Sequence, residues 1–401
     1  MASSRNPLPT LTSPPPSLSF GNSLHEPPLP TLPFDVIPEI LCFLPVKFLL
    51  RSRCVCKSWN SLVSDPKFAK KHFCMSAARH IYFISYKRSD TEYSFRSYPL
   101  NSVFTKRATP QDKFEYFPNN FRGKRRIMHS YGFVGSCNGI LCIADDNDKG
   151  LVILLNPSIR KFKELPLLET PPSAMFGNFE TTLGFGYDSF TENYKVVVVM
   201  RYKMRVGSHY RDYVYKTEVK IHTLGTNSWK SIQEFPFGVV PIGQSGKFLS
   251  GTINWLTSID LQRESPRFIV SFDLGKESYQ KVLPPDYGGV DVCHFLALGV
   301  LRDCLCLASR DDTYSVKDVW VMKEYGNRES WTKLFNVSYR GDPKYSVFGE
   351  PIYIFEDNQV LLKFPRYLNL KLIDSRNGTF TSTGFNNTPE ICNESLISPC
   401  S

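Results

Sequence analysis

The segment LPFDVIPEILCFLPVKFLLRSRCVCKSWNSLVSDPKF, residues 32–68, has the pattern of several short helices. Its apolar residues recur at helical spacing, and prolines separate the runs. Pro33 and Pro45 each suit a helix start, where the missing N–H costs nothing. Asp65 followed by Pro66 is typical of an N-cap and a first helical residue, so a further short helix should follow. We therefore predict a small all-α unit of three to four short helices.

A unit this small has a marginal core and usually gains stability from a partner. Its charge indicates what kind of partner that is. Between residues 33 and 75 the acidic residues are Asp35, Glu39 and Asp65, and the basic ones are Lys47, Arg51, Arg53, Lys57, Lys67, Lys70 and Lys71. This excess of positive charge favours an acidic partner, and Trp59 and the leucines would supply apolar anchors.

The same segment resembles the F-box motif of plant F-box proteins over its whole length and without gaps. In that family the F-box docks on a small acidic adaptor that links it to a cullin scaffold. The family's adaptor-binding positions correspond here to Leu32, Pro33, Ile40, Leu41, Leu44, Pro45, Val55, Cys56, Lys57 and Trp59. The sequence alone does not separate the residues that bind the adaptor from those that form the core of the module.

Beyond about residue 81 the pattern changes to short strands and turns, in keeping with an aromatic content of 14%. About five units recur with a spacing of roughly 40 to 50 residues, and residues 81–118 could form one more, degenerate unit. In each unit a Gly-marked strand comes first, an inner apolar strand and a turn follow, and a strand ending in Ser-Trp or Leu-Pro closes it. We predict an all-β, propeller-like domain of antiparallel sheets, with a β-sandwich or an irregular stack of sheets as the alternative.

This region resembles the F-box-associated interaction domain of plants, often labelled kelch-like. The resemblance is carried by residues 135–139, Asn156-Pro157, residues 183–188 and residues 319–322. In that family the domain captures the protein to be ubiquitylated. The strict kelch pattern of a Gly-Gly pair followed by spaced Tyr and Trp is missing here.

The resulting domain prediction has four parts. Residues 1–30 form a disordered Pro/Ser-rich tail, 31–75 the F-box, 76–390 the β-domain, and 391–401 a C-terminal tail. The tail at 1–30 has no apolar run of the kind found in signal peptides, and no aliphatic run is long enough to span a bilayer. The eleven cysteines are scattered, which is typical of reduced thiols. We expect a cytoplasmic or nuclear protein.

Motifs that carry catalysis or bind metals are missing. The sequence has no phosphate-binding G-x-x-x-x-G-K-[ST] loop, no G-x-S-x-G nucleophile elbow and no H-E-x-x-H zinc motif. The acidic run at 145–150 lacks the spacing of a calcium loop. We therefore expect no catalytic residue, no cofactor and no metal site.

Two basic clusters remain. Residues 122–126 contain Arg122, Lys124, Arg125 and Arg126, and residues 201–211 combine basic residues with tyrosines. A solvated loop is the simpler interpretation of the first cluster. The second is compatible with nucleic-acid binding or with a partner-binding rim of the β-domain.

Together these patterns predict a non-catalytic substrate receptor of an SCF-type cullin-RING ubiquitin ligase. The partners would be the acidic adaptor, through it a cullin, and an unidentified target protein, without nucleic acid or membrane. The alternatives are a non-degradative F-box regulator, an enzyme with a propeller active site, and a nucleic-acid binder. Neither the target nor the residues that bind it can be named from the sequence.

Overall fold

A computed structural model describes most of the chain. The described residues are 33, 35–76, 78–87, 92–104, 112–114, 131–145, 150–169, 180–205, 213–242, 245–259, 267–286, 295–310, 316–336, 349–364, 369–377, 379–383, 385 and 389–400. The predicted basic cluster at 122–126 and the predicted tail at 1–30 lie outside them.

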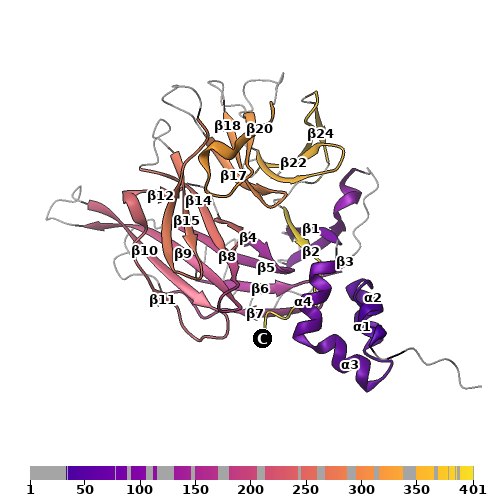
Figure 1. Cartoon of the computed structure of the whole chain (residues 1–401). Coiled ribbons are helices and arrows are strands. Elements are labelled where there is room, and N and C mark those ends of the chain that lie inside the picture. Colours follow the sequence, from indigo (N-terminus) through magenta and orange to yellow (C-terminus); the bar gives the residue numbers. More distant parts are fainter. Residues whose placement is uncertain are drawn as a thin grey trace, which may run out of the picture.

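Four short helices form the N-terminal module, as the sequence predicts (Figure 1). They are α1 (Val36–Leu41), α2 (Val46–Ser52), α3 (Lys57–Ser64) and α4 (Pro66–Met75). Asp65 caps α4, because its Oδ1 atom accepts a hydrogen bond of 2.8 Å from the backbone N–H of Lys67. Pro66 is the first residue of α4, so the predicted cap and first helical residue are both confirmed.

The β-domain is a six-bladed propeller of antiparallel sheets (Figure 1), here named blades A to F. Blade A contains β1 (Arg79–Lys87), β2 (Glu92–Pro99), β3 (Asp112–Phe114) and β25 (Pro389–Asn393). Blade B contains β4 (Tyr131–Cys137), β5 (Ile140–Asp145), β6 (Val152–Asn156) and β7 (Lys161–Glu164). Blade C contains β8 (Glu180–Asp188), β9 (Asn193–Arg205), β10 (Tyr213–Thr223) and β11 (Lys230–Ser231).

The remaining three blades follow along the chain. Blade D contains β12 (Val240–Pro241), β13 (Lys247–Leu249), β14 (Thr252–Ser258), β15 (Arg267–Asp273) and β16 (Ser278–Val282). Blade E contains β17 (Phe295–Leu301), β18 (Cys304–Arg310), β19 (Val316–Met322) and β20 (Trp331–Asn336). Blade F contains β21 (Glu350–Ile354), β22 (Gln359–Phe364), β23 (Asn369–Asp374) and β24 (Phe380–Ser382).

The prediction of which strand is the inner one was wrong. Near the axis, neighbouring blades contact each other through strands such as β4, β8, β17 and β21. Each of these is the first strand of its blade in the sequence. The apolar strand that was predicted to be the inner one, for example β6, is buried at four of its five positions because it lies within a sheet covered on both faces. A continuous apolar run in the sequence therefore indicates that a strand is buried within its sheet. It does not indicate that the strand lies close to the propeller axis. On the inner strand β17 a Cβ at Gly299 would lie 2.4 Å from the backbone O of Pro351, so only glycine fits there.

Blade A is built from both ends of the propeller sequence. Strand β25 pairs with β1 in the register Arg79↔Asn393 to Phe83↔Pro389, and this pairing closes the ring. The degenerate unit predicted at 81–118 is therefore a true blade, but its inner strand comes from the far end of the chain. The segment predicted as a tail, 391–401, accordingly begins inside β25. Pairing with β1 satisfies backbone groups that an open edge would leave exposed.

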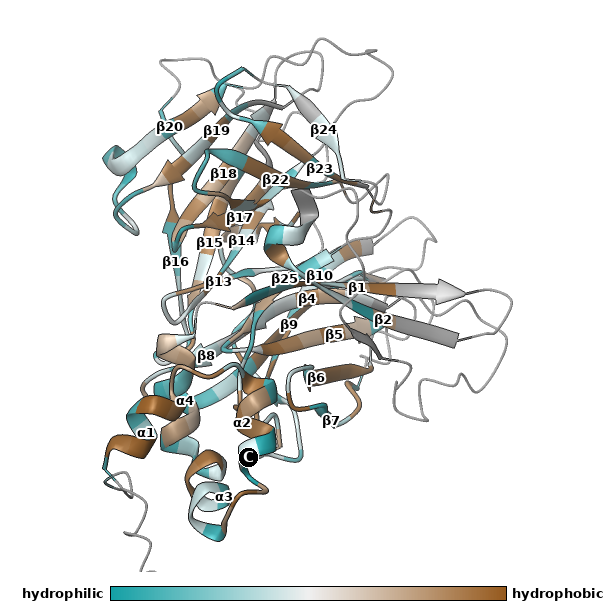
Figure 2. Ribbon diagram, turned by 90° about the vertical axis from the view of Figure 1, so that its right-hand side faces the viewer, coloured by the Kyte–Doolittle hydropathy of each residue, from teal (hydrophilic) through white to brown (hydrophobic). Residues whose placement is uncertain are grey.

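The propeller has two unlike faces. Tight turns such as 138–139, 157–160 and 189–192 join strands on one face, here called the turn face. The opposite face, here called the loop face, is the one at which β9 ends and β10 begins. The four helices lie on the turn-face side, and β1 runs away from them (Figure 2).

Candidate adaptor-binding surface and its coupling to the propeller

Helix α1 carries two apolar stripes on opposite sides. Ile37, Leu41 and Leu44 face the core of the helical module, where they pack with residues of α2, α3 and α4. Val36, Ile40 and Phe43 form the second stripe, with exposed fractions of 38%, 46% and 72%. Spacings of three and four residues place these three side chains on one face. This face has no apolar cover in the described part of the chain and forms a ready contact surface for another protein.

The start of α3 extends this surface. Val55 is 65% exposed, and Cys56 and Lys57 are also exposed. Val55 and Cys56 precede α3, and the side chain of Cys56 does not cap the helix, so it is not engaged in that local role. An exposed apolar residue next to a cation is typical of the edge of a protein interface.

The predicted adaptor-binding residues divide into four groups in the structure. Pro33, Ile40, Pro45, Val55, Cys56 and Lys57 are exposed. Leu44 and Trp59 are half-buried and pack against the module core. Leu41 is only 2% exposed and belongs to the core, so its contribution to a contact is indirect. Leu32 lies outside the described residues.

Sequence reasoning missed two exposed aromatic residues, Phe43 and Phe48. Phe43 follows Ile40 at a spacing of three residues, and this spacing was the available signal for it. Phe48 is 51% exposed on α2, with the guanidinium carbon of Arg51 5.8 Å from its ring centroid. Both enlarge the apolar area that the helical module exposes.

The positive charge of the module is largely available to a partner. Lys71 pairs with Glu39, and Lys70 pairs with Glu192 of the propeller at 3.0 Å. These hydrogen bonds raise the pKa of both lysines, since they stabilise the charged form. Among the described residues, no ion pair engages the remaining basic side chains of α2 and α3, which are Lys47, Arg51 and Lys57.

Residues 394–400, here called the C-terminal strut, join the helical module to the propeller. Leu396 is 9% exposed and lies in the core of the helical module, together with Ile397 and Ile159 from the turn face. The side-chain N–H groups of Asn156 donate to the backbone O atoms of Ser395 and Ile397 at 2.9 and 2.7 Å. The strut therefore belongs to both cores at once.

A glycine fixes the position of the strut. Gly139 has a φ of +80° and lies at the tight turn between β4 and β5. A Cβ at this position would lie 2.1 Å from the Cβ of Ser395. Conformation and space both require glycine here, and the turn face is thereby shaped to seat the strut.

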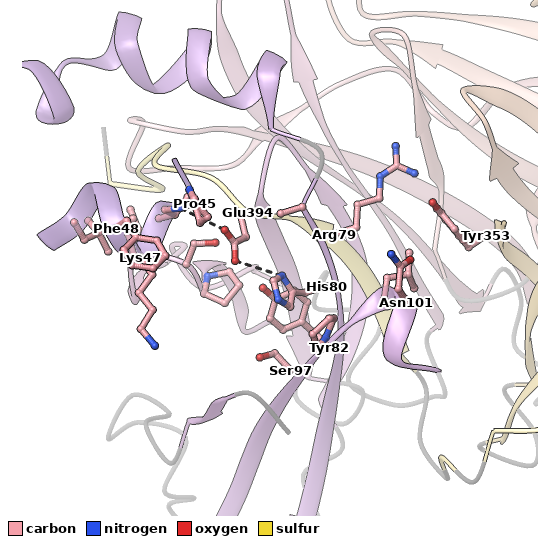
Figure 3. A pocket seen from close by; sticks show the side chains of 18 of the residues that line it. Pro45, Lys47, Phe48, Arg79, His80, Tyr82, Ser97, Asn101, Tyr353 and Glu394 are labelled. Carbon is pink, nitrogen blue, oxygen red and sulfur yellow. Dashed lines mark hydrogen bonds and ion pairs between the residues drawn. The ribbon is translucent and has the colours of Figure 1, made fainter. Parts of the chain in front are cut away.

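A cavity of about 1310 Å³ lies where the helical module, the strut and the propeller meet (Figure 3). Phe48 and Lys47 of α2 line one side, and Arg79 and His80 of β1 line another. Glu394 stands between them: it accepts from the backbone N–H of Val46 at 3.4 Å and lies 3.6 Å from His80 Nδ1. The two domains are thus joined by polar contacts as well as by the shared core.

Charged side chains gather on the inner strands of the propeller. Lys247 of β13 pairs with Glu350 of β21, and Lys363 is the cross-strand partner of Glu350. Burial raises the pKa of Glu350, but Lys247 and Lys363 together hold it below its ordinary value. Burial raises the pKa of Glu390 on β25, and the two lysines only partly offset this. Sequence reasoning missed this cluster, because its carboxylates come from distant blades. Lys247 and Lys363 offset part of their negative charge.

Metal-binding clusters and membrane-spanning helices are both missing from the described part of the chain. Within the described ranges, no group of three or more His, Cys, Asp or Glu side chains could hold a metal ion. In the same residues no helix is long and apolar enough to cross a membrane.

Comparison with known proteins matches both parts of the chain. The F-box domain matches residues 29–71, and the F-box associated beta propeller domain matches residues 91–392. An F-box/kelch-repeat protein of Arabidopsis thaliana is 31% identical over 360 residues, which cover 87% of this chain and 89% of that protein. The F-box protein CPR1 of Arabidopsis thaliana is 28% identical over 361 residues, which cover 83% of this chain and 79% of that protein. The chain therefore belongs to the plant F-box proteins that carry an F-box-associated β-propeller domain.

Proposed function

We propose that this chain is the target-recognition subunit of an SCF-type cullin-RING ubiquitin ligase in the cytoplasm or nucleus. In this proposal the F-box binds the acidic adaptor, and the adaptor links it to the cullin. The propeller holds a target protein. Ubiquitin transfer is then accelerated by proximity, and other subunits supply the chemistry, so this chain contributes no catalytic residue.

The exposed stripe of Val36, Ile40 and Phe43 carries the proposal. Burying one large apolar side chain contributes about 1.5 to 3 kcal/mol, so covering this stripe would yield several kcal/mol of binding free energy. Val55 adds to it at the start of α3. Few soluble proteins leave such residues together in water without a partner to cover them.

The charge of the module supports an acidic partner. Lys47 and Lys57 are exposed and flank the apolar residues Phe48 and Val55. Such cations at the edge of an interface speed association and fix its orientation more than they add affinity. An acidic adaptor fits this arrangement, whereas a basic partner would be repelled.

The coupling of the two domains supports a scaffold role. The C-terminal strut packs into the F-box core and is hydrogen-bonded to the turn face. A receptor that presents a target at a fixed distance from the adaptor needs such a junction. Proximity catalysis is sensitive to misplacement, because acceleration depends on geometry.

The proposed adaptor-binding set follows from exposure. We assign direct contacts to the exposed stripe of Val36, Ile40 and Phe43. The other exposed members of the predicted set join it, namely Pro33, Pro45, Val55, Cys56 and Lys57, with Leu32 retained from the family resemblance. Leu44 and Trp59 would contribute their exposed edges. Leu41 supports the set from the core.

The test is the affinity of the purified full chain for the acidic SCF adaptor. Ile40→Ser and Val55→Ser together should weaken binding by about 30-fold, because both large apolar side chains would be buried against the adaptor. The matched control is Leu334→Ser, which alters a propeller residue exposed to a similar degree, 37%. Equal affinities of the double variant and the control would overturn the proposal. Adaptor binding without turnover of any bound target would instead indicate a non-degradative F-box regulator.

A further inference from the structure

The described residues of the propeller expose few large apolar side chains, and more than half of these lie on one face of two neighbouring blades. Those exposed outside the F-box are Leu167, Phe190, Val214, Tyr215, Phe237, Ile259, Leu283, Tyr325 and Leu334. Of these, Val214, Tyr215, Phe237, Ile259 and Leu283 stand at the loop-face ends of strands in blades C and D. Apolar side chains that gather at one edge of a domain mark an interaction surface more strongly than scattered ones.

The hairpin of β9 and β10 projects beyond the rest of blade C (Figure 1). The two strands pair from Lys195↔Thr223 as far as Arg205↔Tyr213, whereas β8 pairs with β9 only as far as Arg201. Among the described strands, nothing else pairs with the outer part of this hairpin. A two-stranded ribbon is marginally stable by itself.

One face of this ribbon is directed towards blade D. Val199 and Val219 form a cross-strand pair and pack in the core that blades C and D share. Side chains alternate along a strand, so Arg201 and Tyr215 lie on the same face as these valines. The guanidinium carbon of Arg201 stands 4.0 Å from the ring centroid of Tyr215, which confirms that the two side chains are together.

Blade D contributes aromatic and cationic side chains to the same edge. Phe237 is 56% exposed, and its ring centroid lies 6.2 Å from that of Phe268. The ammonium group of Lys281 stands 4.0 Å from the Phe268 ring centroid. Phe268 also packs against the shared core of blades C and D.

The backbone of Phe237 is strained. Its φ of +63° and ψ of 13° lie in the left-handed region, where a residue other than glycine costs about 1 to 2 kcal/mol. The neighbouring Gly238 would adopt such a conformation without cost. A large aromatic residue that is held in a strained conformation and left exposed points to a function for the ring.

The charge of this edge is predominantly positive. We call the set Arg201, Tyr215, Phe237, Ile259, Phe268 and Lys281 the C–D rim. Glu180 pairs with Arg201 at 3.2 Å, and Glu218, three residues from Tyr215, pairs with Lys220 at 3.4 Å. Glu234 is a further described carboxylate close to the rim in the sequence. The described parts of the ribbon beyond Met200, residues 201–205 and 213–216, contain four basic residues and no acidic one. An acidic partner therefore complements the rim.

We propose that the C–D rim binds an acidic peptide segment of the target that carries an aromatic or aliphatic side chain. This inference rests on the proposed function, because it names the class of target that the receptor would take. The apolar side chain packs against Phe237 and Phe268, and the carboxylates lie near Arg201 and Lys281. The aliphatic side chains Ile259, Val214 and Leu283 at the same edge favour a peptide over single-stranded nucleic acid, which would stack only on the rings of the rim.

The test uses a fluorescent random copolymer of glutamate and tyrosine, with polyglutamate as the probe for charge alone. The full chain should bind the copolymer more tightly than polyglutamate, as measured by fluorescence anisotropy. Phe237→Gly removes the ring and relieves the backbone strain, so the fold is maintained. This variant should bind the copolymer about tenfold more weakly, as should Lys281→Glu.

Matched controls separate this inference from the proposed function. Ile40→Ser should leave the affinity for the copolymer unchanged and lower the affinity for the adaptor. Phe237→Gly should lower the affinity for the copolymer and leave the affinity for the adaptor unchanged. Unchanged copolymer binding in both rim variants would overturn the inference and leave the adaptor result standing. Binding of single-stranded oligouridylate that Phe237→Gly weakens, without any copolymer binding, would overturn it in favour of nucleic acid.

Discussion

The F-box and the propeller expose large apolar side chains to very different degrees. Within residues 36–75 the F-box exposes Val36, Ile40, Phe43, Phe48, Val55 and Met75, although it contains only four short helices. The propeller is several times longer, and its described residues expose only a few more, five of them at the loop-face ends of strands in blades C and D. The difference shows that the F-box has an apolar surface that the described part of this chain leaves uncovered.

The two domains also build their cores differently. In the propeller each blade is covered on both faces by its neighbours, so apolar clusters repeat around the ring. The F-box has one cluster, and it is completed by Ile159 of blade B and by Leu396 and Ile397 of the strut. A module this small cannot bury enough apolar surface alone. Its stability should therefore depend on the propeller, whereas the reverse should not hold.

The largest effect is expected inside the propeller, from Glu350→Gln. This change leaves the largely buried ammonium group of Lys247 without its carboxylate partner, which should lower the free energy of unfolding by about 3 kcal/mol at neutral pH. Denaturant titration followed by tryptophan fluorescence would measure it. Asp374→Asn is the matched control, since it breaks an exposed pair with Arg376 and should have a far smaller effect. Equal losses in both variants would contradict a special role for the pair on the inner strands.

A smaller and local effect is expected from Leu396→Ala in the strut. The change removes apolar contacts from the F-box core and should cost about 2 kcal/mol. Amide hydrogen exchange should speed up in α1 to α4 and remain unchanged in β14 and β18, because the F-box depends on the strut and the propeller does not. Faster exchange throughout the propeller would show instead that the two domains unfold as one unit.

The smallest effect, opposite in sign to that of Glu350→Gln, is expected from Glu390→Gln. Burial raises the pKa of Glu390 above its ordinary value of 4.5. The folded state therefore binds a proton on the Glu390 carboxyl group more tightly than the unfolded state does. The contribution of Glu390 to the free energy of unfolding is therefore present at pH values below 4.5. It is lost as the pH rises through the pKa of Glu390 in the folded state. Glutamine does not ionise, so the variant should be the more stable protein at neutral pH, and the gap should close on acidification. A gap that does not change with pH would exclude this explanation.

Features that depend on residues close together in the sequence could be predicted, whereas features that join distant parts of the chain could not. The four helices, the Asp65 cap and Pro66 as the first residue of α4 depend on neighbouring residues, and they were predicted correctly. The outward stripe of α1 could not be chosen, because Val36, Ile40 and Phe43 are as apolar as the inward stripe. The closure of blade A by β25 and the pairing of Lys247 with Glu350 join distant parts of the chain, and no local pattern records them.

The most direct test of the central claim is hydrogen exchange of the full chain with and without the acidic adaptor. If the uncovered stripe is the docking surface, the adaptor should slow exchange at residues 36–43 and 55–59. It should leave the C–D rim strands β10 and β15 unchanged. Unchanged exchange in α1 and α3 at saturating adaptor, or slowing confined to the propeller, would contradict the account.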